Sequence, residues 1–322
     1  MTISRRNFLK AAAGGGAVLA TTGVADPALA RPNLEMPPKA IGLLYDATLC
    51  VGCKACVVAC REANDLSPVF STDEKLWDTP LDISAYTFNV IKMYKDGSGE
   101  HKDQLKDGHA FVKRSCLHCV DPSCVSACPV SAMEKNAENG IVSYDADRCI
   151  GCRYCVAACP YGVPRFQYDT PKPKIGKCEL CRHRLPEGKI AACAEKCPTG
   201  ATLFGTVEQI KGEIARRRAA KPGEMVAYER QRVGSGDTHE KKAPLYVNHV
   251  YGEKELGGTQ MMMLSGVPFV ALGMPELPER SYSSISETIQ HTLYGGLIAP
   301  VVALGGLVAL AWRASKNHQD EE

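Results

Sequence analysis

Sixteen cysteines fall into four runs of four, and no other feature constrains the fold of this 322-residue chain as strongly. The first and third runs share the spacing C-x2-C-x2-C-x3-C, whereas the middle gap widens to four residues in the second run and to eleven in the fourth. The four runs, in chain order, are Cys50, Cys53, Cys56 and Cys60; Cys116, Cys119, Cys124 and Cys128; Cys149, Cys152, Cys155 and Cys159; and Cys178, Cys181, Cys193 and Cys197.

This spacing indicates [4Fe-4S] clusters. Two x2 steps let a short loop present three thiolates to one iron–sulfur cube, and the last cysteine of the run ligates the other cluster of a two-cluster module. Four runs therefore predict four [4Fe-4S] clusters. A proline follows the last cysteine of the second, third and fourth runs and ends the local helix, but Arg61 takes its place after the first.

Zinc sites and disulfides are the alternatives to clusters. Zinc ribbons use two separated C-x2-C pairs for one ion, which only the fourth run could imitate. Disulfides suit an exported protein with an even number of cysteines, but this chain would then carry many strained C-x2-C bridges side by side. The spacing, rather than the number of cysteines, favours iron–sulfur clusters.

The segments around the runs repeat and predict an α+β fold. Strand, cluster loop, short helix and strand recur, which predicts tandem bacterial-ferredoxin-like [4Fe-4S] modules over 40–205, with an insertion at 61–109. The strands are expected at 41–46 and 140–145, at 110–113, and, returning after a run, at 131–133 and 200–204.

A helix and a polar extension, 206–287, follow the modules. Thr206 and Gln209 form a capping-box pattern, which predicts a helix that begins there and runs to about Ala220. The apolar run 261–264 is expected to be a core strand. The insertion and the extension are predicted to contact partners, because the cluster modules need neither.

The N-terminus has the pattern of an export signal. Arg5 and Arg6 precede a short apolar segment, and an A-x-A cleavage pattern ends at Ala30, so 1–30 is interpreted as a twin-arginine signal peptide. An ordinary secretory signal with two adjacent arginines is the alternative. The twin-arginine route carries folded proteins, which allows an exported protein to hold clusters.

The segment 293–312 is uncharged and as long as a membrane-spanning helix. Arg313 and Lys316 follow it, so the positive-inside rule predicts a single C-terminal anchor, with the tail 313–322 in the cytoplasm and the main body at the periplasmic face. The alternative is a buried core helix.

Charge and motifs exclude several functions. The formal net charge of +2 does not suit a nucleic-acid-binding protein. The sequence contains no nucleophile elbow, phosphate-binding loop or dinucleotide fingerprint, so we expect no catalytic residue. A chain of clusters without a substrate site is expected to carry electrons. His118, inside the second run, is interpreted either as a hydrogen-bond donor that tunes a cluster or as a surface loop residue.

Five motifs outside the cysteine spacing carry a family resemblance. The chain resembles the membrane-anchored iron–sulfur subunits of [NiFe]-hydrogenase 2, within the family of four-cluster ferredoxin-type electron-transfer subunits. The motifs are the segment 116–124 around the second run, Leu245-Tyr246-Val247, Tyr251-Gly252-Glu253-Lys254-Glu255, Gly257-Gly258-Thr259-Gln260 and Ile289-Gln290-His291-Thr292-Leu293-Tyr294.

The resemblance implies partners and a pairing of the runs. It implies that electrons pass from the small and large hydrogenase subunits, through this chain, to an integral membrane subunit that reacts with quinone. The inner runs are expected nearer the membrane. The implied ligand sets are Cys50, Cys53, Cys56 and Cys197 (set 1); Cys60, Cys178, Cys181 and Cys193 (set 2); Cys116, Cys119, Cys124 and Cys159 (set 3); and Cys128, Cys149, Cys152 and Cys155 (set 4).

Two further functions are compatible with the sequence. The chain could serve a molybdopterin enzyme for formate, polysulfide or tetrathionate, although many such subunits lack their own signal or anchor. A zinc-stapled structural adaptor is a further alternative, which would be colourless, whereas a cluster protein is brown.

Overall fold

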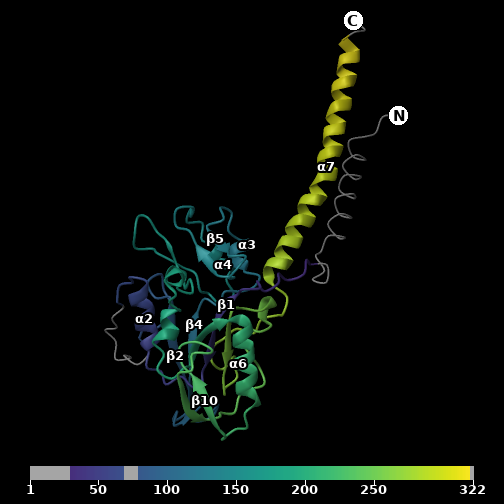
Figure 1. Ribbon diagram of the computed structural model, residues 1–322. Coiled ribbons are helices and arrows are strands. Elements are labelled where there is room, and N and C mark those ends of the chain that lie inside the picture. Colours follow the sequence, from purple (N-terminus) through teal and green to yellow (C-terminus); the bar gives the residue numbers. More distant parts are fainter. Residues whose placement is uncertain (1–29, 69–78, 320–322) are drawn as a thin grey trace. The chain divides into compact units, whose positions relative to one another are not determined.

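The computed structural model describes residues 30–68 and 79–319 (Figure 1). The predicted signal peptide therefore lies outside the described residues except at Ala30, as does the end of the predicted tail at 320–322. The chain divides into two units, Asn33–Ser281 and a second unit that contains the C-terminal helix, and each is described by itself.

The centre of the larger unit is a three-stranded sheet in the order β12-β1-β9. Strand β1 (Ile41–Asp46) pairs antiparallel with β9 (Thr202–Thr206) and parallel with β12 (Met261–Leu264). All four residues of β12 are buried, which confirms the expected core strand. Strand β1 has the predicted bounds, and β9 begins within the predicted segment 200–204. The extension thus contributes a strand to the core.

Helix α6 (Val207–Ala219) packs on this sheet (Figure 1). The capping box is present, because the Thr206 hydroxyl accepts from the Gln209 amide and the Gln209 side chain accepts from the Thr206 amide. Near its end, the fully buried Arg217 forms ion pairs with Asp46 of β1 at 2.8 Å and with Glu213 at 2.7 Å. The helix is thereby tied to the central strand by a buried charge network.

The insertion forms most of a second sheet, in the order β2-β4-β3. Strand β4 (Gly108–Ser115) includes the predicted strand 110–113, pairs antiparallel with β2 (Asn89–Lys95) and parallel with the two-residue β3 (His101–Lys102). Six of the eight β4 residues are buried, so this strand runs through the interior of the unit.

Short hairpins frame the second and third runs. Strands β5 (Met133–Lys135) and β6 (Val142–Tyr144) pair antiparallel; β6 lies within the predicted strand 140–145, whereas β5 begins at the last residue of the predicted strand 131–133. A second hairpin pairs β7 (Arg165–Phe166) with β8 (Ile175–Gly176). The same unit also contains β10 (Met225–Glu229), β11 (Thr238–Lys242), and the short 3-10 helices η3 (Arg182–Glu187) and η4 (Glu255–Gly257).

A helix follows the loop of each run, and proline sets its length. Where proline follows the last cysteine, the helix ends before that cysteine: α3 (Ser123–Ser126), α4 (Tyr154–Ala158) and α5 (Ala192–Glu195). Helix α2 (Ala55–Ala63) instead continues through Cys60, because Arg61 keeps the amide and the helical backbone that proline would exclude.

The second unit contains α7 (Tyr282–Gln319), which includes the predicted anchor segment 293–312. Within the described part of the chain, no helix combines the length and the apolar character that crossing a membrane requires. The predicted anchor is therefore not confirmed.

Candidate iron–sulfur sites

The loops of the first and third runs have the same backbone shape. Gly52 (φ 70°) and Lys54 (φ 59°) are left-handed in the first loop, as are Gly151 (φ 73°) and Arg153 (φ 65°) in the third. Glycine is required at 52, because a β-carbon there would lie 2.4 Å from the Phe111 ring. These turns curl each loop so that its backbone amides face its own cysteine sulfurs.

Among the described residues, at least five backbone amides donate hydrogen bonds to cysteine sulfurs. In three runs the donor lies two residues after the cysteine, as in Gly52 to Cys50 Sγ at 3.5 Å. The other four pairs are Gly151 to Cys149 Sγ (3.4 Å), Leu180 to Cys178 Sγ (3.4 Å), Ala132 to Cys128 Sγ (3.2 Å) and Thr202 to Cys197 Sγ (3.4 Å). Such donors stabilise negative sulfur and raise the reduction potential of a bound cluster.

All sixteen cysteines are free thiols, which disagrees with a disulfide scaffold. Burial raises the pKa of Cys56 and of Cys60 to about 12, and that of Cys155 to about 11. Such thiols hold their protons until a metal replaces them. The donor set therefore fits iron–sulfur clusters, which bind thiolates.

The structure brings together thiols from different runs. Burial is the largest cause of each raised pKa, and nearby thiolates add to it, which requires short distances because the Coulomb interaction falls with separation. The thiols that act on one another are Cys56 with Cys193, Cys50 and Cys197; Cys60 with Cys193 and Cys181; Cys119 with Cys116, Cys159 and Cys124; and Cys155 with Cys128, Cys149 and Cys152. Cys53 is exposed.

One cavity provides an independent view of set 2. Its lining includes all four cysteines of that set, Cys60, Cys178, Cys181 and Cys193. Among the described side chains, no three of His, Cys, Asp or Glu converge as they would around a single metal ion. A four-iron cube does not need such convergence, because it is a multi-iron group held by four separate thiolates.

Neighbouring sets are also close to one another. Cys193 of set 2 raises the pKa of Cys56 in set 1, after the effect of burial. In the same way, Cys116 of set 3 acts on Cys178 of set 2, and Cys155 of set 4 acts on Cys124 of set 3. Thiols of the implied sets 1 and 2, 2 and 3, and 3 and 4 therefore act on one another.

His118 is fully buried, so its interpretation as a surface loop residue is wrong. Burial, together with the charges of Lys177 and Lys135, holds the pKa of His118 well below its ordinary value, and the ring is neutral. Its Nδ1 accepts a hydrogen bond from the Val142 amide at 3.0 Å, which assigns the proton to Nε2. Nε2 has no hydrogen-bond partner among the described residues.

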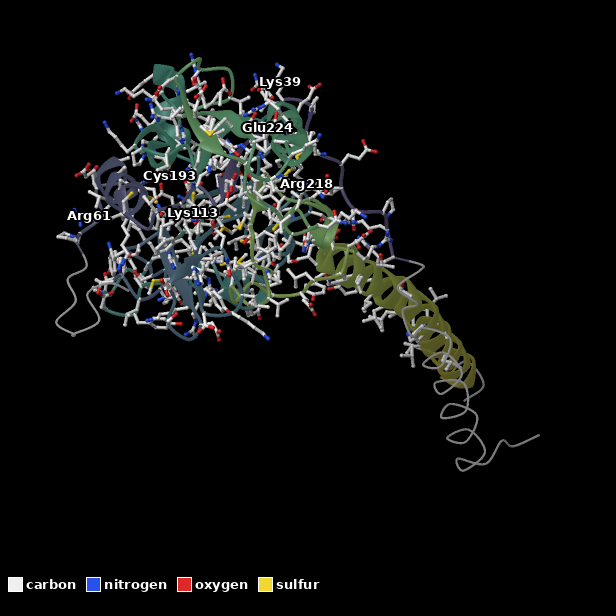
Figure 2. All side chains as sticks on the ribbon, turned by 90° about the horizontal axis from the view of Figure 1, so that it is seen from below. Lys39, Arg61, Lys113, Cys193, Arg218 and Glu224 are labelled. Carbon is white, nitrogen blue, oxygen red and sulfur yellow. The ribbon has the colours of Figure 1, made fainter. Side chains whose placement is uncertain are left out.

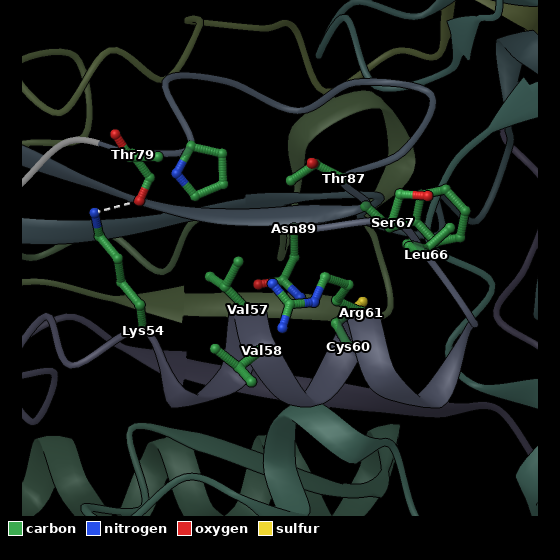
Figure 3. A pocket seen from close by; sticks show the side chains of 12 residues that line it. Lys54, Val57, Val58, Cys60, Arg61, Leu66, Ser67, Thr79, Thr87 and Asn89 are labelled. Atoms are coloured by element: carbon green, nitrogen blue, oxygen red, sulfur yellow. Dashed lines mark hydrogen bonds between the residues drawn. The ribbon is translucent and has the colours of Figure 1, made fainter. Parts of the chain in front are cut away.

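Two asparagines beside Cys60 were not predicted from the sequence, because only cysteine and histidine were considered as site residues. Asn64 Nδ2 lies 3.7 Å from Cys60 Sγ, and Asn89 also hydrogen-bonds to the Cys60 side chain, which lowers the pKa that burial raises. Asn64 follows Cys60 by four residues on one helical turn, which is the one local signal for it. Figure 3 shows Asn89 near Cys60 in a surface pocket lined by α2 and the insertion. Lys54 also lines this pocket, and its Nζ donates to the Thr79 carbonyl at 2.6 Å.

Comparison with known proteins agrees with these sites. Models of the 4Fe-4S dicluster domain match residues 49–132 and 108–207. The chain is 46% identical over 325 residues to the hydrogenase-2 operon protein HybA of Escherichia coli O157:H7, covering 99% of this chain and 98% of that protein. The chain belongs to the HybA family. A model of the twin-arginine translocation signal matches residues 2–22, which supports export of this HybA-family chain.

More distant relatives of the HybA family belong to formate dehydrogenases. The chain is 34% identical over 290 residues to the formate dehydrogenase-O iron-sulfur subunit of Escherichia coli K12, covering 89% of this chain and 84% of that subunit. It is 32% identical over 274 residues to the nitrate-inducible formate dehydrogenase iron-sulfur subunit of the same strain, covering 84% and 82%. The higher identity and the nearly complete coverage favour the HybA family.

Proposed function

We propose that this chain is the electron-transfer subunit of a periplasmic, membrane-bound [NiFe]-hydrogenase. It relays electrons from the hydrogenase small and large subunits, through four [4Fe-4S] clusters, to an integral membrane subunit that reacts with quinone. The 46% identity to HybA over nearly the whole chain is the observation that carries this proposal. The cavity lined by Cys60, Cys178, Cys181 and Cys193 supports ligand set 2, and the mutual effects of the set 3 thiols and of the set 4 thiols support those two sets.

The residues of the chain would hold and tune the clusters, with no catalytic residue of its own. When bound, the clusters accept and release single electrons. The cysteines of sets 1 to 4 hold them, and amides such as that of Gly52 donate to the sulfurs. The buried side chains around the runs exclude water, which strengthens the electrostatic interactions between nearby charges.

The exposed apolar residues support one partner at each end of the relay. Val51 lies in the loop of set 1, and Ile150 occupies the equivalent position in the loop of set 4; both are exposed. Tyr154 adds a second exposed apolar side chain beside Ile150. Since exposed apolar groups mark protein contacts, we infer that hydrogenase docks near Val51 and the quinone-reactive subunit near Ile150.

Replacing Cys155 with alanine tests the relay. We expect the variant complex to lose quinone reduction by hydrogen, because set 4 loses a ligand, while hydrogen-dependent reduction of an artificial dye by the catalytic subunit persists. Anaerobic iron and sulfide analysis before the assay verifies that the unmodified chain holds sixteen of each, as four cubes on sixteen cysteines require. Undiminished quinone reduction would refute the relay, and zinc in place of iron would favour the structural adaptor.

The formate dehydrogenase relatives supply a second candidate, a molybdopterin enzyme as partner. The two candidates differ in the metal of the catalytic subunit. We expect nickel to copurify with the chain from solubilised membranes. Molybdenum without nickel would favour the second candidate.

We also propose that 293–312 anchors the chain with its tail, 313–322, in the cytoplasm. The segment lies within α7, and its described side chains, such as Leu297, Val302 and Val308, are exposed and apolar. In cells that lack the quinone-reactive membrane subunit, deleting 293–322 is expected to move the protein from the membrane fraction to the soluble periplasmic fraction. Replacing His318 and Gln319 with alanine is the control, and continued membrane retention of the deletion variant would contradict the anchor.

A further inference from the structure

Lys113 is a charged side chain in the interior that lacks a partner. It lies in β4 and is 1% exposed, and its Nζ has no hydrogen-bond partner among the described residues. A buried ammonium without a hydrogen-bond partner is strongly unfavourable, so a nearby negative charge has to compensate it. The other buried lysine near the runs, Lys177, differs, because its Nζ donates to the Val142 and Cys178 carbonyls.

The surroundings of Lys113 identify the compensating charge. Lys113 lies beside Cys193 (Figure 2) and lines the cavity that holds the four cysteines of set 2. Thiolates of Cys193 and Cys60 in set 2, and of Cys56 and Cys197 in set 1, raise its pKa against the effect of burial. The ammonium therefore lies at the set 2 cavity, within electrostatic reach of Cys56 and Cys197 of set 1.

Strand β4 explains this position. Side chains alternate along a strand, so Phe111, Lys113 and Ser115 point to one face. Phe111 contacts the loop of the first run at Gly52, so this face is directed at the clusters. Arg114 points to the other side, where it lies 3.9 Å from Asp82.

We propose that Lys113 is a shared electrostatic residue of clusters 1 and 2, which raises the reduction potentials of both and lowers the repulsion between their negative charges. A [4Fe-4S] cube with four thiolates carries a negative charge that grows on reduction, so a fixed ammonium between two cubes favours the reduced state of each. The clusters in turn supply the charge that a buried Lys113 lacks within the chain. This inference rests on the proposed function as a cluster carrier and adds a residue that sets its energetics.

The test is an EPR-monitored redox titration of Lys113→Met in the intact complex, with Arg114→Met as the matched control. Methionine keeps the apolar length and removes the charge. At a fixed ambient potential, we expect the ratio of reduced to oxidised cluster to fall by about tenfold for clusters 1 and 2, equivalent to about 59 mV for a one-electron couple. Clusters 3 and 4, and all four clusters of Arg114→Met, should change less.

Two further measurements separate possible outcomes. Variants with one ligand replaced in each set assign the EPR signals to clusters, and iron analysis shows whether four clusters are present. If Lys113→Met loses clusters, the titration compares Lys113→Arg with Lys113→Gln. The reduction potentials of clusters 1 and 2 should be higher in the charged arginine variant than in the neutral glutamine variant. Unchanged potentials of clusters 1 and 2, or an equal shift of all four, would overturn the role of Lys113 while leaving the relay intact; a wild-type chain without iron would overturn the relay itself.

Discussion

The outer half of the cluster body, formed by the first and fourth runs, differs from the inner half, formed by the second and third. The outer half is built on the sheet β12-β1-β9, with two clusters of buried side chains around it. The inner half has hairpins of two or three residues per strand and a small group of five buried residues around them, of which Cys124 and Cys155 are proposed ligands, while Leu117, Tyr161 and Val163 belong to the larger cluster. The buried group around the inner hairpins is therefore small and partly made of sulfur, whereas the sheet of the outer half lies among two larger clusters of buried side chains.

This difference has a thermodynamic consequence. A group of buried residues as small as that around Met133 and Val142 cannot offset the entropy of ordering the chain around it. Binding of a cofactor that occurs only in the folded state adds its free energy to folding. We therefore expect the inner half to depend on its clusters for its structure more than the outer half does.

Removal of iron should produce the largest difference in stability between the two halves. After anaerobic chelation, amides of β5 and β6 should exchange hydrogen at close to unfolded rates, because little polypeptide core holds them. Amides of β1 and β12 should stay protected by their sheet. Hydrogen exchange detected by mass spectrometry makes the comparison, and β10, which lies outside the runs, is an internal reference. Equal loss of protection in both halves would contradict the distinction.

Substitution of Arg217 tests the stability of the outer half without touching a cysteine. Arg217→Leu should lower the free energy of unfolding by about 3 kcal/mol, because Asp46 and Glu213 lose a buried partner. Anaerobic denaturant titration of the cluster-loaded protein measures this loss. Arg218→Leu, at the exposed neighbouring position, is the control and should change stability by less than about 0.5 kcal/mol. Similar losses for both variants would mean that the buried network does not stabilise the outer half.

The predictable parts of the molecule are those determined by local sequence. Cysteine spacing determines the loops, and the capping box determines where α6 begins at Val207. The missing proline at Arg61 signals a different helix end, but its effect, the longer α2, needs the structure. In these cases the residues that cause the feature are neighbours in the chain.

The unpredictable parts depend on segments that meet from far apart. Strand β12 pairs with β1 although more than 200 residues separate Leu43 from Met261. The same segment covers the second run, where the Gln260 amide donates to the Leu117 carbonyl at 3.0 Å, and this contributes to the burial of His118. Neither the loop position of His118 nor the basic character of Lys113 reveals that the side chain is buried.

His118 offers the finest test of the comparison, because it belongs to the inner half as Lys113 belongs to the outer. Its Nε2–H lacks a partner in the described chain, so we predict that it donates to sulfur of cluster 3. His118→Leu should lower the potential of cluster 3 alone, and by less than Lys113→Met lowers clusters 1 and 2, because a neutral donor is lost rather than a full charge. Redox titration measures the shift, and His183→Leu, an exposed histidine, is the control. If the reduction potentials of clusters 1 and 2 fall instead, His118 does not act on the inner half. If only the potential of cluster 3 falls, a neutral hydrogen bond tunes a cluster of the inner half.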